Sequence, residues 1–202
     1  MKTVILTGGM GSGKSAVCSC LKAHGVPVYD SDSRTKALYG KDALLVGRLE
    51  EALRVPLRGP DGKLDRRTLS ALIFSDPSRK SLVESLVHPA VLRDFLRWKR
   101  WQRPKGWTYG PVPFVILESA IILHCPVFDG IGDKVVLVDA DESVRAGRAV
   151  SRDGSTPEEA LRRIRSQSFD LSRVDAVLRN DGSLEDLPAE VDRVFLNLFL
   201  TL

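Results

Sequence analysis

Gly8-Gly9-Met10-Gly11-Ser12-Gly13-Lys14-Ser15 is the stretch that decides the fold of this chain. An apolar run, residues 3–7, precedes it, and residues 16–21 follow it with the pattern of the first turns of a helix. A strand, a glycine-rich loop and a helix in this order are the context in which Gly-x-x-x-x-Gly-Lys-Ser indicates a phosphate-binding P-loop. The glycines let N–H groups turn toward phosphate oxygens, and the start of the helix adds unpaired donors. The stretch predicts binding of a nucleoside triphosphate, the alternative being a glycine-rich turn without a ligand.

Two side chains of this loop have separate expected roles. Lys14 can reach the β- and γ-phosphates, which makes it a candidate for catalysis as well as for binding. The hydroxyl of Ser15 can hold Mg²⁺, so Ser15 is the candidate metal ligand. The expected ATP-binding residues of the loop are Gly11, Ser12, Gly13, Lys14, Ser15 and Ala16.

The composition is that of an ordinary globular protein. The chain has 202 residues, of which 43% are hydrophobic, and a formal net charge of +4. This length is enough to bury a core, and the mild positive charge suits a small polyanionic substrate without requiring nucleic acid. Cys18, Cys20 and Cys125 form neither a disulfide framework nor a paired zinc motif. We expect them to be small buried side chains in a reducing cytosol.

No targeting or membrane segment is expected. Met1-Lys2 leads straight into the first strand, a pattern that predicts no signal peptide. No apolar run approaches the ~20 residues that span a bilayer. We therefore expect a cytoplasmic protein with no membrane partner.

Four further apolar runs, residues 26–29, 114–117, 135–138 and 176–178, predict strands that complete a sheet. Because longer segments with helical spacing separate them, we expect a three-layer α/β fold with five parallel strands. We expect a single domain in three parts. These are a core of residues 1–33, 108–140 and 173–202, a helical insertion of residues 34–107 for a second substrate, and a helical lid of residues 141–172.

Acidic residues follow three of the expected strands. Asp30 and Asp32 come after the second strand, at the sheet edge where ligands of open α/β sheets bind. A kinase needs a carboxylate there to receive a hydroxyl proton or to steer the metal, although one of the two also suits a helix N-cap. Glu118 and Asp139 each end an apolar run, and either can support a metal or cap the next helix.

Two features of the insertion stand out. His88-Pro89 is expected to interrupt a helix, because proline disfavours a helical conformation in the residue before it. Residues 93–107 interleave basic side chains with Trp98, Trp101 and Trp107, a mixture that can bind nucleic acid. Apolar residues at helical spacing instead favour an amphipathic helix with a solvated basic face.

Residues 141–172 predict two helices rich in arginine. Thr156 and Pro157 are typical of a helix start and follow a break at Gly154. Arginine stabilises charge on a transferring phosphoryl group, and Arg148 and Arg152 share one helix face by their spacing. The alternative is that these arginines are solvated surface side chains.

Several motifs in a fixed order resemble the dephospho-CoA kinase family, and the resemblance runs nearly from end to end. They are residues 7–15, Asp30-Ser31-Asp32, residues 61–67, Phe74-Ser75-Asp76-Pro77, His88-Pro89, residues 118–122, Arg148-x-x-x-Arg152-Asp153, the residues around Arg165 to Gln167, and Asn180-Asp181-Gly182-Ser183. The P-loop alone indicates only a nucleoside triphosphate, whereas the ordered set is much more specific.

The resemblance implies that the γ-phosphoryl group of ATP passes, with Mg²⁺, to the ribose 3′-hydroxyl of dephospho-CoA, the last step of coenzyme A synthesis. By position, Asp32 resembles the general base and an acceptor ligand, and Arg148 resembles the lid arginine near the phosphates. Asn180 matches a position near the adenine of ATP. Arg66 and His88 match the acceptor side, the alternative for His88 being a helix-start histidine bonded to the backbone.

Three positions depart from the family pattern. Ser31 stands where alanine is common, and residues 114–118 differ from the common Pro-Leu-Leu-Phe-Glu strand, which weakens the assignment of Glu118. Arg145 stands where glutamine is common and adds a positive charge. This departure leaves open which of Arg145, Arg148 and Arg152 faces the phosphates.

Two other functions stay open at this point. One is a P-loop kinase that acts on a nucleoside or a nucleoside monophosphate. The other is an ATP-binding regulator or nucleic-acid-stimulated ATPase that uses residues 93–107. The ordered motifs favour the dephospho-CoA kinase reading over both, with no nucleic-acid partner.

Overall fold

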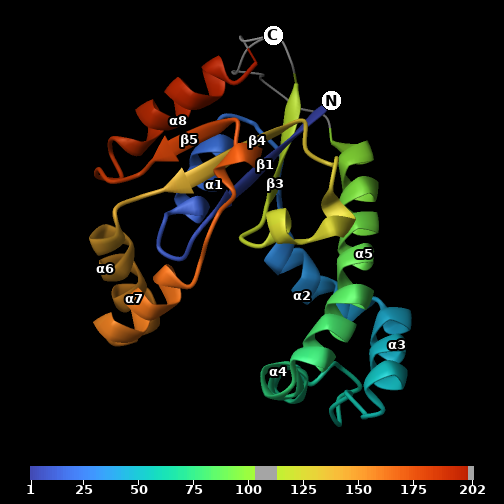
Figure 1. Ribbon diagram of the computed structural model, residues 1–202. Coiled ribbons are helices and arrows are strands. Elements are labelled where there is room, and N and C mark those ends of the chain that lie inside the picture. The colour runs from blue at the N-terminus through green and yellow to red at the C-terminus, as the bar shows by residue number, and fades with distance from the viewer. Residues whose placement is uncertain (103–112, 200–202) are drawn as a thin grey trace. The chain divides into compact units, whose positions relative to one another are not determined.

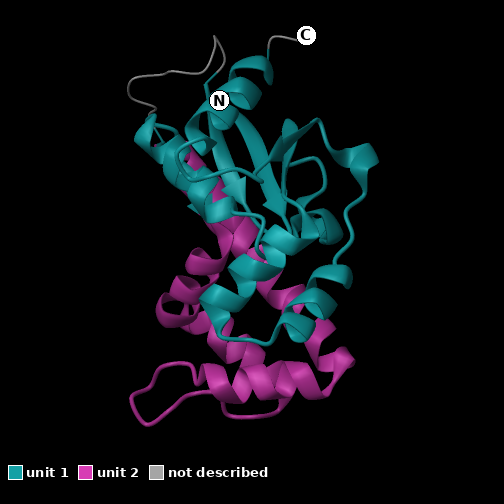
Figure 2. Cartoon of the chain, turned by 90° about the vertical axis from the view of Figure 1, so that its left-hand side faces the viewer, with its two compact units in different colours: residues 1–29, 102–202 teal, residues 30–101 magenta. Residues whose placement is uncertain are grey.

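The computed structural model describes residues 1–102 and 113–199. The chain divides into two compact units, shown in teal and magenta in Figure 2. The first unit comprises residues 1–29 and 102–202, and the second comprises residues 30–101. Arg103, Lys105 and Trp107 of the predicted basic stretch lie outside the described residues.

A five-stranded sheet forms the centre of the first unit, in the order β2-β3-β1-β4-β5. β1 pairs with β3 and with β4, and β4 pairs with β5, each time in parallel (Figure 1). The five-stranded parallel α/β fold predicted from the sequence is therefore confirmed. The strands are β1 (Lys2–Gly8), β2 (Val28–Asp30), β3 (Phe114–Glu118), β4 (Lys134–Asp139) and β5 (Ala176–Arg179).

Two helices cover one face of this sheet and bury its core. These are α1 (Lys14–Ala23) and α8 (Leu187–Asn197), which contribute to a cluster with β1, β3, β4 and β5. Phe114 of β3 stacks on Phe195 of α8 with ring centroids 5.7 Å apart. β1 is the central strand, and every residue after its first is buried. It therefore fixes the position of its last residue, Gly8, from which the P-loop starts.

The remaining helices of the first unit lie in the segment 141–172, for which the role of a lid stays a prediction. α6 (Glu142–Asp153) packs on α7 (Pro157–Arg165), and we call the two the α6–α7 hairpin. Thr156 caps α7 as predicted, because its side chain accepts from the Glu159 N–H while Glu159 reaches back to the Thr156 N–H. Three short 3₁₀ turns complete the unit: η1 (Ile122–His124), η2 (Pro126–Phe128) and η3 (Leu171–Arg173).

The second unit consists of four helices with their own apolar core. They are α2 (Ser31–Lys41), α3 (Ala43–Leu53), α4 (Arg66–Ser75) and α5 (Pro77–Trp101). Leu49 of α3 and Phe95 of α5 are fully buried. The guanidinium of Arg34 donates two hydrogen bonds, of 2.8 and 2.9 Å, to Asp94 and so ties α2 to α5. The helical content predicted for this segment is confirmed.

One expectation for this unit is wrong. α5 runs through His88 and Pro89 without a break, whereas the sequence pattern predicts an interruption there. A proline inside a helix removes one backbone hydrogen bond and disfavours the turn before it. Here Val87, Ala90 and Val91 are buried on both sides of the proline, and their packing offsets that loss.

Two further expectations concern the three cysteines and membrane-spanning helices. Cys18 and Cys125 are buried and Cys20 is partly buried, all three as free thiols, in keeping with a packing role. Within residues 1–102 and 113–199, no helix is long and apolar enough to cross a membrane.

Candidate active site

The P-loop lies between β1 and α1, as the motif predicts. Gly11 and Gly13 have φ angles of 75° and 93°, in the left-handed region that glycine adopts without strain. The ammonium group of Lys14 donates to the Gly8 carbonyl at 2.8 Å and to the Gly9 carbonyl at 3.4 Å. The Ser12 N–H donates to the Gly9 carbonyl at 3.3 Å, which closes the loop on itself.

The glycines are also required by what packs against them. A Cβ at Gly11 would collide with the backbone of Arg145, and a Cβ at Gly13 would collide with the side-chain amide of Asn180. A Cβ at Gly9 would collide with the Arg145 guanidinium. The P-loop therefore packs closely against α6 and against the chain after β5, and glycine at these positions leaves room for that packing.

The loop opens on a cavity of about 360 Å³. The N–H groups of Gly11, Gly13 and Ser15 donate to no other group within the part of the chain that the structure describes. Such unpaired amides at a helix N-terminus favour an anion, because the helix dipole adds positive charge there. The cavity is lined by Gly9, Met10, Gly11, Gly13, Lys14, Ser15, Ala120, Arg148, Arg152 and Gln167.

Asn180 supports the loop from the end of β5. Its N–H donates to the Asp139 carbonyl at 2.8 Å, and its side-chain amide donates to the Ser12 carbonyl at 2.8 Å. The residue is 4% exposed. In this arrangement the amide holds the P-loop itself, and contact of Asn180 with adenine stays a prediction.

The three arginines of α6 have different surroundings. The Arg148 guanidinium donates to the Asn180 carbonyl at 2.8 Å and to the Gly182 carbonyl at 3.4 Å, and it lines the cavity. Arg152 also lines the cavity and forms a bidentate pair with Asp153. The Arg145 side chain, 12% exposed, lies over the P-loop and is absent from the cavity lining. Arg148 and Arg152 thus line the P-loop cavity, whereas Arg145 does not.

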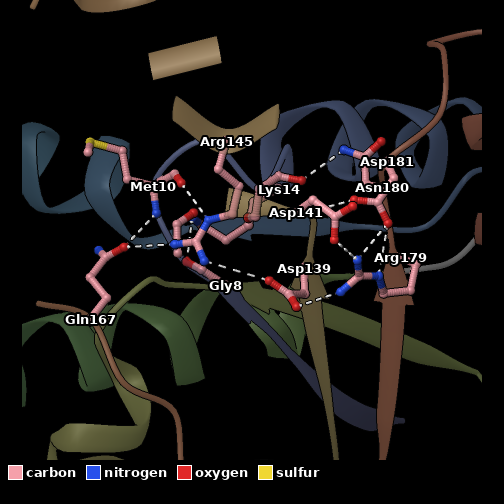
Figure 3. A network of polar contacts seen from close by, with 12 residues as sticks. Gly8, Met10, Lys14, Asp139, Asp141, Arg145, Gln167, Arg179, Asn180 and Asp181 are labelled. Carbon is pink, nitrogen blue, oxygen red and sulfur yellow. Dashed lines mark hydrogen bonds and ion pairs between the residues drawn. The ribbon is translucent and has the colours of Figure 1, made fainter. Parts of the chain in front are cut away.

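An acidic and basic network joins the ends of β4 and β5 (Figure 3). Arg179 bonds Asp139 at 2.9 Å, Asp141 at 2.7 Å and Asp181 at 2.8 Å, while Arg145 lies 3.7 Å from Asp139. The Asp141 N–H holds the pKa of the Asp181 carboxyl below its usual range, with Arg179 acting in the same direction. The hydrogen bond to Asp141 in turn raises the pKa of Arg179.

The donors present fit a metal-bound nucleotide. Mg²⁺ in kinases takes ligands from substrate phosphates, waters and few protein oxygens, so it does not need a cage of protein ligands. Ser15 is exposed beside Lys14 in the cavity lining, which suits its hydroxyl for that role. Of the two strand-end acids, Asp139 is engaged by two arginines, and which of Asp139 and Glu118 supports the metal stays a prediction. Among the described residues, no group of three or more His, Cys, Asp and Glu side chains could hold a metal alone.

The other predicted site residues belong to the second unit. Asp30 is the N-cap of α2, because its carboxylate accepts from the Ser33 N–H at 3.0 Å. Asp32 occupies the exposed first turn of the same helix. The two aspartates therefore divide the roles left open by the sequence: Asp30 caps the helix, and the carboxylate of Asp32 is exposed.

Arg66 and His88 occupy different parts of this unit. Arg66 donates to the Lys36 carbonyl at 3.0 Å and lines a cavity of about 410 Å³ with Tyr39, Lys63 and neighbouring residues. His88 lies within α5, and burial lowers the pKa of its imidazole. It is not a helix-start residue, and it does not line the cavity that Arg66 lines. The structure thus gathers Gly11–Ala16, Arg148 and Asn180 in one unit, and Asp32, Arg66 and His88 in the other.

Gln167 is the site residue whose contact sequence reasoning missed. Its side-chain oxygen accepts from the Met10 N–H at 2.8 Å, and it lines the P-loop cavity. The residue follows α7, far from the P-loop in sequence, so only the folded hairpin brings it to the loop. The signal in the sequence was its place near Arg165 in the family-like segment.

Comparison with known proteins agrees with this geometry. The model of the family described as dephospho-CoA kinase matches residues 2–186. A dephospho-CoA kinase of Porphyromonas gingivalis is 37% identical over 172 residues, which cover 85% of this chain and 80% of that protein. A dephospho-CoA kinase of Frankia casuarinae is 32% identical over 201 residues, which cover 98% of this chain and 84% of that protein.

A solved structure shares the fold at the same level of identity. The crystal structure of TT1252 from Thermus thermophilus aligns with a TM-score of 0.77 and 32% identity, and it covers 98% of this chain and 97% of that one. The match of the family model spans the P-loop, the second unit and the α6–α7 hairpin. The chain therefore belongs to the dephospho-CoA kinase family.

Proposed function

We propose that this chain transfers the γ-phosphoryl group of ATP to the ribose 3′-hydroxyl of dephospho-CoA. The products are coenzyme A and ADP, and the reaction is the last step of coenzyme A synthesis. The observation that carries the proposal is a P-loop cavity lined by Lys14 and two arginines in a chain of this family. We place the reaction in the cytoplasm, with dephospho-CoA as the only partner and no nucleic acid or membrane involved.

The P-loop residues supply the binding of ATP. The unpaired N–H groups of Gly11, Gly13 and Ser15 donate hydrogen bonds to the phosphate oxygens, and Lys14 exchanges its carbonyl partners for the β- and γ-phosphates. Ser15 would hold Mg²⁺, which neutralises charge on the phosphates when bound. Arg148 is already fixed by two carbonyls beside the cavity, so it can stabilise charge on the moving phosphoryl group with little reorganisation.

Asp32 orients the acceptor and takes its proton. A ribose hydroxyl is a weak nucleophile, and a carboxylate that accepts its proton as the bond to phosphorus forms is the usual solution in kinases. The carboxylate of Asp32 is exposed on the first turn of α2, whereas Asp30 is the N-cap of that helix. Arg66 and His88 hold other parts of the acceptor. All parts of this assignment concern position and charge, which are what phosphoryl transfer requires.

A panel of acceptors tests the proposal. The chain is incubated with ATP and Mg²⁺ and with dephospho-CoA, AMP, CMP or shikimate, and ADP release is measured. We expect turnover with dephospho-CoA well above that with the others. Preference for AMP or CMP would identify a nucleoside monophosphate kinase, and ADP release stimulated only by RNA or DNA would identify a nucleic-acid-dependent ATPase.

Asp32→Asn separates the general base from the rest of the site. The variant should lose kcat by roughly 10²–10⁴-fold while ATP binding changes little, because the amide cannot accept the proton. Glu51→Gln, an exposed acid on α3 of the same unit that lines neither cavity, is the matched control and should keep kcat. Near-normal kcat for Asp32→Asn would remove it from this role.

A further inference from the structure

The peptide groups on both sides of Met10 are held by side chains from outside the P-loop. The Met10 N–H donates to the Gln167 side-chain oxygen at 2.8 Å, and the Met10 carbonyl accepts from the Arg145 Nε at 3.0 Å. Arg145 also donates from a second nitrogen to the same Gln167 oxygen, at 3.3 Å. We call these three residues the Met10 clamp; they are drawn together in Figure 3.

The clamp fixes the orientation of two successive peptide planes. In a trans peptide the C=O and the following N–H point in opposite directions, and no cis peptide occurs among the described residues. Because Arg145 holds the Met10 carbonyl, the Gly11 N–H of the same peptide points away from Arg145. Gln167 fixes the preceding peptide by holding the Met10 N–H. The Gly9 carbonyl of that peptide therefore points away from Gln167, toward Ser12 and Lys14.

The guanidinium of Arg145 is itself fixed by charge. A terminal nitrogen lies 3.7 Å from Asp139, whose other oxygen is bound by Arg179 at 2.9 Å. The side chain is 12% exposed, so it is largely screened from water. A planar guanidinium with three partners in different directions has little freedom to turn, which makes it suited to hold a backbone carbonyl.

Within the clamp, Arg145 acts on the loop from outside the cavity, while Met10 and Gln167 are part of its lining. Arg145 does not line the P-loop cavity, whereas Arg148 and Arg152 do. The contact to the Met10 carbonyl is made by the charged side chain of Arg145. Charged donors make stronger hydrogen bonds than neutral ones, by roughly a factor of two.

We propose that Arg145 and Gln167 are positioning residues that set the affinity for the nucleotide by orienting the Gly11 amide for phosphate. The clamp also couples the α6–α7 hairpin to the loop, because a movement of the hairpin releases Met10. The ligand is the ATP of the proposed function, but the acceptor plays no part in this inference.

Direct binding of a non-hydrolysable ATP analogue, adenylyl imidodiphosphate with Mg²⁺, tests the clamp without any acceptor. Arg145→Met and Gln167→Leu should each raise its Kd about tenfold or more by titration calorimetry, the loss typical of one hydrogen bond to a charged group. Arg162→Met removes an exposed arginine from the same hairpin and should bind like the parent chain.

Hydrogen exchange and a conservative variant distinguish positioning from general damage. Peptides that span residues 8–17 should exchange faster in Arg145→Met than in Arg162→Met, while the core strand β4 keeps its protection in both. Arg145→Lys keeps a positively charged donor for the Met10 carbonyl, and it should restore part of the affinity and of the protection lost in Arg145→Met.

Steady-state kinetics complete the test. The KM for ATP should follow the Kd, and kcat at saturating ATP should stay within about threefold of the parent, because the clamp acts on binding. An unchanged Kd for Arg145→Met, or a large fall in kcat at unchanged Kd, would overturn the proposal. If no acceptor were phosphorylated but the Kd values behaved as described, the proposed function would fail and the clamp would stand.

Discussion

Asn180→Ala tests whether the P-loop depends on its support from β5. The substitution removes the 2.8 Å hydrogen bond from the side-chain amide to the Ser12 carbonyl and leaves that carbonyl without its partner in a site that is 4% exposed. Loss of a buried hydrogen bond with one partner left unsatisfied costs about 1–3 kcal/mol. The Ser12 carbonyl shares a peptide with the Gly13 N–H, so freeing it also frees a phosphate donor.

Asn197→Ala provides the matched control. The Asn197 amide donates to the Arg193 carbonyl at the same distance of 2.8 Å, but on the exposed surface of α8. An exposed substitution of this kind changes stability by about 0.5 kcal/mol or less. The two variants therefore differ in burial while the bond that is lost has the same length.

Urea unfolding and ATP titration are the assays. Asn180→Ala should lower the free energy of unfolding by about 1–3 kcal/mol and raise the Kd for ATP, whereas Asn197→Ala should do neither. Asn180→Asp should be worse than Asn180→Ala at neutral pH, because a carboxylate oxygen would then face the Ser12 carbonyl and the phosphates. Equal stability and equal ATP affinity for Asn180→Ala and Asn197→Ala would refute the supporting role.

Three further predictions concern the rest of the fold. Thr156→Ala removes the α7 capping box and should lower the free energy of unfolding by about 1 kcal/mol, measured against exposed Ser151→Ala, which should be neutral. Phe195→Ala removes a buried ring that stacks on Phe114 and should cost about 3–5 kcal/mol in urea unfolding; a cost near 1 kcal/mol would contradict the packing. Burial lowers the pKa of His88, so the unfolded chain binds its proton first and stability should fall as the pH drops below about 6.5; His88→Gln should reduce that fall, and an unchanged pH profile would count against it.

The core of the fold was predictable from local patterns. Five apolar runs with helical segments between them define the strands, and the P-loop motif defines which strand leads to the nucleotide. The Thr156 cap occurs where short-range chemistry predicts a helix start. These features depend on a few neighbouring residues, so the sequence shows them directly.

The features that were missed depend on distant residues. Pro89 lies inside α5 because buried side chains on both sides of it stabilise the helix, and local propensity carries no information on that packing. Gln167 reaches Met10 across 157 positions of sequence, and the Asn180 amide reaches Ser12 across 168. Only the folded α6–α7 hairpin and the end of β5 bring these groups to the loop.

The different contacts of the three arginines of α6 could not be predicted from the sequence either. Spacing places Arg148 and Arg152 on one helix face but cannot say whether Arg145 contacts the nucleotide or the loop. In the structure Arg145 bonds the Met10 carbonyl while Arg148 lines the cavity, and which arginine contacts the phosphates stays a prediction. The roles of Asp32, Arg66 and His88 toward the acceptor stay predictions.

The position of the transferred phosphate tests the central claim most directly. The chain is incubated with dephospho-CoA, Mg²⁺ and ATP labelled at the γ-phosphate, and the labelled product is located by phosphorus NMR and by mass fragmentation. The account predicts a single product with the label on the ribose 3′-oxygen and stoichiometric ADP. Label at any other oxygen of dephospho-CoA, or ADP release without a labelled acceptor, would contradict it.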